Sequence, residues 1–127
     1  MLTEMVTGGK ISESAYLCLK LAWIYRGEIQ EAKANGAAQE RISMYEKYEK
    51  EYLEDAYRGF KQARETEYPP IAGMDENTIT YLLTSIGIHC GKIDEARRYG
   101  SALLISRTAS MKLKNKTRDV LETIKKN

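Results

Sequence analysis

The spacing of hydrophobic residues predicts a helix over residues 11–34. Apolar side chains recur there at i, i+3, i+4 and i+7, and they occupy three sides of the segment. A helix that is apolar on several sides is covered by several neighbours, so we expect it to be central in the fold. The middle of its pattern is formed by Ile11, Ala15, Cys18, Ala22, Tyr25, Ile29 and Ala32.

A second helix is predicted over residues 38–66, with a narrower apolar face and Glu, Lys or Arg at most other positions. Asn35-Gly36 separates the two segments, and both residues tolerate a left-handed backbone that ends a helix. Two helices of this length joined by a short turn form a long antiparallel hairpin. We therefore expect one hairpin over residues 11–66.

Three shorter helices follow a loop at residues 67–78 that contains Pro69-Pro70. We expect them over residues 75–90, 93–106 and 111–126, with Asp75 capping the first and Gly91 ending it. No segment alternates in the manner of a strand. The pattern predicts a single all-α domain over residues 1–127, with a second hairpin at 75–106 and a capping helix at 111–126.

Two successive helical hairpins are typical of tetratricopeptide repeats, in which small residues let two helices approach and an aromatic residue fills the gap to the next hairpin. Gly100 and Leu103 depart from the expected order of a large and then a small residue, and the first hairpin is longer than a standard repeat. The prediction is therefore tetratricopeptide-like. The matching positions are Ala22, Tyr25, Ala56, Phe60, Ala63, Gly91 and Ala96.

Three strings, "LKLAWIYRG", "YPPIAGMDENTITYLL" and "KNKTRDVLETIKK", resemble the C-terminal helical half of the bacterial family called domain of unknown function 2225. The likeness runs from about Ile11 to Lys126. Members of that family usually carry an N-terminal half whose paired cysteines resemble a zinc ribbon. This chain has no CxxC motif, so we expect that half to be missing and its metal function not to apply.

Composition adds little to the function but excludes some classes. The net charge is +2, with six basic and two acidic residues in 110–127. This basic tail could contact phosphate groups, so a nucleic-acid-associated module is one alternative function. We expect a cytoplasmic protein without a membrane segment, because residues 1–10 lack the apolar run of a signal peptide and the two cysteines are far apart.

The chain's one histidine, His89, precedes Cys90, which raises the question of a metal site or a nucleophile with its base. Neighbouring residues on a helix point about 100° apart, so they do not chelate one ion together or face each other. We read the pair as the corner between two helices, with Cys90 buried and inert. No set of base, nucleophile and oxyanion or metal site occurs, so we expect no enzyme and no cofactor.

The function expected from this fold is a non-enzymatic scaffold that binds a protein or peptide; self-association into a homodimer is a further alternative. In tetratricopeptide-like stacks the first helix of each hairpin lines the binding face, which is typically aromatic with a cation at its edge. The residues predicted there are Tyr16, Leu19, Trp23 and Arg26 from the first helix, with Thr78, Tyr81, Ser85 and His89 from the third.

Overall fold

The computed structural model describes residues 11–125, and the side chains of residues 11–124. This part of the chain contains five helices and one isolated backbone pairing, between Ile71 and Met74, but no strand. The all-α prediction is confirmed. The helices are α2 (Ile11–Ala34), α3 (Gln39–Thr66), α4 (Glu76–His89), α5 (Ile93–Leu104) and α6 (Met111–Lys125).

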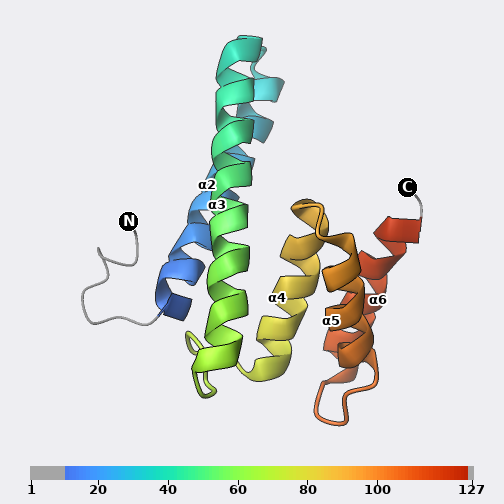
Figure 1. The fold of residues 1–127 in the computed structure, drawn as a ribbon. Coiled ribbons are helices and arrows are strands. Elements are labelled where there is room, and N and C mark those ends of the chain that lie inside the picture. The colour runs from blue at the N-terminus through green and yellow to red at the C-terminus, as the bar shows by residue number, and fades with distance from the viewer. Residues whose placement is uncertain (1–10, 126–127) are drawn as a thin grey trace.

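The helices stack as two hairpins and a closing helix (Figure 1). Helices α2 and α3 run antiparallel, and the end of this hairpin near its turn projects beyond the second hairpin. Helix α4 packs against α3 and pairs with α5, and α6 packs against both α4 and α5. The arrangement as tetratricopeptide repeats stays a prediction.

The helix ends follow the signals in the sequence. Gly36 and Gly91 have φ of 67° and 78°, the left-handed conformation that Gly adopts at least cost. The Asp75 carboxylate accepts a 2.7 Å hydrogen bond from the backbone N–H of Thr78, which caps α4 as expected. Helix α5 ends at Leu104, two residues earlier than predicted.

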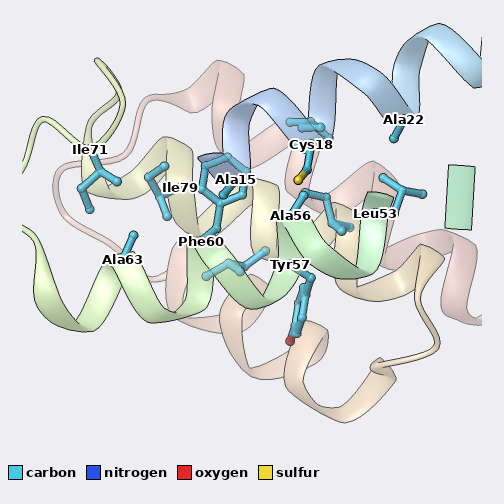
Figure 2. Close-up of a cluster of buried hydrophobic side chains, with 13 residues drawn as sticks. Ala15, Cys18, Ala22, Leu53, Ala56, Tyr57, Phe60, Ala63, Ile71 and Ile79 are labelled. Atoms are coloured by element: carbon cyan, nitrogen blue, oxygen red, sulfur yellow. The ribbon is translucent and has the colours of Figure 1, made fainter. Parts of the chain in front are cut away.

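The core lies where α2, α3 and α4 meet (Figure 2). Phe60 is completely buried at its centre, between small side chains of α2 and α3. Alanine at these positions lets the two helices approach closely, which explains the small residues picked out by the repeat pattern. Ala22, Ala56, Phe60, Ala63 and Ala96 are all buried.

Two glycines allow close helix contacts. A Cβ atom at Gly59 would lie 2.7 Å from the Cβ of Ala15, so α2 and α3 pack backbone to backbone there. A Cβ atom at Gly100 would lie 2.9 Å from a methyl group of Leu121. The repeat pattern expects a large residue at position 100. The capping helix α6 explains the departure, because it needs that space.

Candidate functional site

One side of the stack is formed by the first helix of each hairpin together with the closing helix. We call it the α2–α4–α6 face. It includes six of the eight residues that were predicted to bind a partner. Its members are Tyr16, Lys20, Trp23 and Arg26 on α2, Tyr81, Ser85 and His89 on α4, and Lys112 and Lys116 on α6.

Trp23 is the most prominent apolar group of this face, with 48% of the residue exposed. Arg26 follows three positions later on the same side of α2, and its Nε donates a 2.8 Å hydrogen bond to Oε2 of Glu49 on α3. This pair holds the guanidinium group against α3, one helical turn from Trp23 along α2. Trp23 is exposed and the Arg26 side chain is 40% exposed, and their role in binding a partner stays a prediction.

Leu19 does not belong to the face, and this part of the prediction is wrong. The residue is 1% exposed and lies in the core cluster with Ile79 and Leu83. Helix α2 is turned so that Leu19 points between α3 and α4. The exposed row on α2 is therefore shifted toward Tyr16, Lys20 and Trp23. A helix that is apolar on three sides leaves this rotation undetermined from sequence.

His89 is exposed at the C-terminal end of α4, near the Arg26–Glu49 pair. Partial desolvation lowers the pKa of His89 below 6.5, the positive charge of Arg26 lowers it further, and Glu49 opposes the shift. The charges of Arg26 and Glu49 are thus close enough to His89 to affect its pKa, so the end of α4 lies near the middle of α2. Arg26 and His89 were both predicted for the face.

Each side of the face carries a lysine over a tyrosine ring. The Lys116 ammonium group lies 5.2 Å from the ring centre of Tyr81 and joins α6 to α4. The Lys20 ammonium group lies 4.6 Å from the ring centre of Tyr16, one turn away on α2. Such cation–π contacts keep a positive charge beside an aromatic surface.

A small cavity of about 210 Å³ continues the face between the beginnings of α4 and α6. Its lining includes Thr78, which was predicted for the binding face, together with Lys112 and Lys116. The Thr78 hydroxyl donates a 2.7 Å hydrogen bond to the Asp75 carboxylate, so this residue serves the cap of α4. Thr78 therefore shapes the cavity wall and has no free hydroxyl donor.

Sequence analysis did not single out Lys20, and it assigned Lys112 and Lys116 to a basic tail that could contact phosphate groups. The spacing of Tyr16 and Lys20, one helical turn apart, is a signal that could have been used. The contact between Tyr81 and Lys116 leaves no such signal, because it depends on how α6 packs. The basic tail is divided: Lys112 and Lys116 lie on one side of α6, whereas Lys114 and Arg118 lie about 200° away. The Lys125 side chain and Lys126 lie outside the described residues.

The His89-Cys90 corner has the geometry of a helix end. Cys90 caps α4 at its C-terminus and is half-buried, so the expectation of complete burial is wrong for this residue. Desolvation raises its pKa, and burial raises the pKa of Cys18 to about 11. Among residues 11–124, no three His, Cys, Asp or Glu side chains are grouped so that they could hold a metal ion.

The sequence matches the model of a bacterial family described as "Uncharacterized protein conserved in bacteria (DUF2225)" over residues 1–124. The chain belongs to the DUF2225 family. This match agrees with the resemblance of the three quoted strings, and correspondence to a C-terminal half stays a prediction. No curated protein matches the chain, and no solved structure does. No helix in the described part of this DUF2225 chain is long and apolar enough to cross a membrane.

Proposed function

We propose that this DUF2225 chain is a non-enzymatic, tetratricopeptide-like scaffold that binds an acidic peptide segment on its α2–α4–α6 face. The observation that carries the proposal is the half-exposed Trp23, one helical turn from Arg26, whose guanidinium group is held by Glu49. Trp and Arg are the residues that most often dominate binding energy at protein interfaces. A half-exposed indole that has polar and charged neighbours on its face is suited to contact a partner.

Charge on the face favours an acidic partner. Lys20, Lys112 and Lys116 surround the aromatic surface, and no ion pair is found for any of them among the described residues. Glu49 is occupied by Arg26. A peptide with carboxylates beside an apolar anchor would match this distribution, which raises the rate of association and selects against basic partners.

The nucleic-acid alternative is less well supported. A nucleic-acid surface needs a continuous basic row, whereas the four described basic residues of α6 divide between two sides of the helix.

Cytoplasmic location belongs to the proposal as well. The cytoplasm is a reducing compartment, which would keep Cys18 and Cys90 as free thiols.

Selection of random peptides on the immobilised chain tests the proposal. We expect enriched peptides to combine Asp or Glu with a large apolar residue. Their affinity should fall about tenfold or more for Trp23→Ala and for Lys116→Glu, because each removes a contact of the face. Lys114→Glu is the matched control, since it makes the same charge change on another side of α6 and should leave binding nearly unchanged.

The proposal fails if no peptide is enriched. It also fails if the enriched peptides bind the Trp23→Ala variant as tightly as the original chain. Equal losses for Lys116→Glu and Lys114→Glu would show that net charge, and not this face, controls binding. Circular dichroism of each variant confirms that the helices are retained.

A further inference from the structure

The outer side of the first hairpin carries exposed apolar side chains. Leu17 and Ile24 on α2 are 37% and 58% exposed, with Leu21 half-buried between them, and Met44 on α3 is 44% exposed. We call these four residues the outer strip. The rings of Tyr48 and Tyr52 border it, packed against Tyr25 with ring centres 5.3 Å and 5.9 Å away.

The outer strip faces away from the second hairpin. Leu17 lies about 200° around α2 from Leu19, which points into the core, and Met44 lies about 220° around α3 from Tyr57, which contacts α5. The strip therefore lies at the free end of the stack. It is also separate from Trp23, which is about 100° around α2 from Ile24.

The two ends of the stack differ in polarity. At the far end, α6 presents Asn115 and Arg118 outward, and both are exposed, with Met111 beside them as an exposed apolar residue. Stacked helical repeats need a polar outer surface at each end, because an apolar end remains able to stack further. The α6 end, where Met111 is the exposed large apolar residue of the helix, comes closer to this requirement than the α2–α3 end, where Leu17, Ile24 and Met44 are all exposed.

We propose that a second copy of this chain covers the outer strip, with the strips of two copies packed against each other around a two-fold axis. A head-to-tail contact would place the apolar strip on the side of α6 that carries Asn115 and Arg118. The self-complementary arrangement instead buries both apolar ends and leaves the two α6 ends exposed. Such a contact closes after two copies and gives a discrete dimer.

Charges beside the strip fit a two-fold axis parallel to the helices. Near the turn of the hairpin, Glu28 and Glu31 of α2 lie at the same level along the helix axes as Arg41 of α3. All three line the same small cavity. In the dimer α2 faces α3 of the other copy, so Glu28 and Glu31 of one copy meet Arg41 of the other.

The mass of the chain in solution tests the proposed dimer. Sedimentation equilibrium over a range of concentrations should give twice the 14.5 kDa mass of the chain. The double variant Leu17→Glu/Ile24→Glu should be a monomer with intact helices, because both residues are exposed. Ile105→Glu is the control, since Ile105 is 83% exposed in the loop after α5, and it should remain a dimer.

A charge exchange tests the orientation even if the first variant misfolds. The variants Glu28→Lys/Glu31→Lys and Arg41→Glu should each dimerise at least tenfold more weakly than the original chain, and an equimolar mixture should regain the dimer as a heterodimer. A chain that is monomeric at every concentration overturns the inference, as does a dimer that survives Leu17→Glu/Ile24→Glu. A mixture that stays monomeric overturns the proposed orientation. None of these outcomes depends on peptide binding.

Discussion

The hydroxyl group of Tyr57 on α3 donates a 2.5 Å hydrogen bond to the carboxylate of Glu95 on α5, which also accepts a 3.0 Å bond from Lys61. This contact ties the first hairpin to the second. Tyr57 is buried, so removal of Glu95 would take away the hydrogen-bond acceptor of a largely buried residue. Burial and the bond to Glu95 raise the Tyr57 pKa, and the bonds from Tyr57 and Lys61 lower the Glu95 pKa.

Tyr57→Phe should lower the free energy of unfolding at neutral pH by about 1 kcal/mol, because Glu95 is partly exposed and water can replace the lost donor. The Glu95 pKa in the folded chain lies below 4.5, so the bond contributes fully above that pH. Its contribution is lost as pH falls through the folded pKa. Urea unfolding of both chains across acidic pH should show their difference shrinking. A constant difference would contradict this account.

Gly27 and Gly59 form a matched pair for helix packing. Gly27 lies on an exposed side of α2 with no atom within 4 Å of an added Cβ, so Gly27→Ala should stabilise the chain by up to about 1 kcal/mol. Gly59→Ala places a methyl group against Ala15 and should destabilise it by about 1–3 kcal/mol. Thermal unfolding measures both. Equal effects of the two substitutions would show that α2 and α3 are farther apart than described.

Phe60→Ala should cost about 3–5 kcal/mol, because it leaves a cavity at the centre of the core. Chemical denaturation measures the loss of unfolding free energy, with one common dependence on denaturant concentration used for both chains. A cost below about 1 kcal/mol would mean that the core can close around the missing ring. Tyr68→Ala is a suitable control, because Tyr68 is 91% exposed and should change stability little.

His89 should titrate below pH 6.5. Arg26→Gln should raise the His89 pKa, since it removes a nearby positive charge, whereas Glu49→Gln should lower it. The unfolded chain binds this proton more tightly, so stability should fall as pH drops below about 6.5. Nuclear magnetic resonance follows the single imidazole directly. If the His89 pKa does not change in Arg26→Gln, Arg26 and His89 are too far apart to belong to one face.

Most of the fold could be predicted because its signals are local. Helical periodicity, the turn at Gly36 and the cap at Asp75 all act within a few residues, and the small residues around Phe60 follow a known packing rule. Helix rotation could not be predicted in the same way. Leu19 and Trp23 lie on neighbouring sides of one apolar helix, and only the positions of α3 and α4 decide which of them is covered.

The contact of Lys116 with the binding face joins distant segments, which explains why the sequence did not reveal it. Lys116 reaches Tyr81 because α6 folds back against α4. Gly100 is a related case: the repeat pattern marks it as an exception, and the reason becomes visible only with Leu121 in place. Local patterns therefore gave the helices, and packing between them decided the site.

Trp23 fluorescence tests the proposed function most directly, because Trp23 is the chain's only tryptophan and lies on the α2–α4–α6 face. In the free chain its emission should be red-shifted and readily quenched by acrylamide. Saturation with a selected acidic peptide should shift the emission to the blue and protect it from quenching. Fluorescence anisotropy of a labelled peptide measures binding independently. If the anisotropy shows saturated binding while the emission and quenching of Trp23 stay unchanged, the account is contradicted.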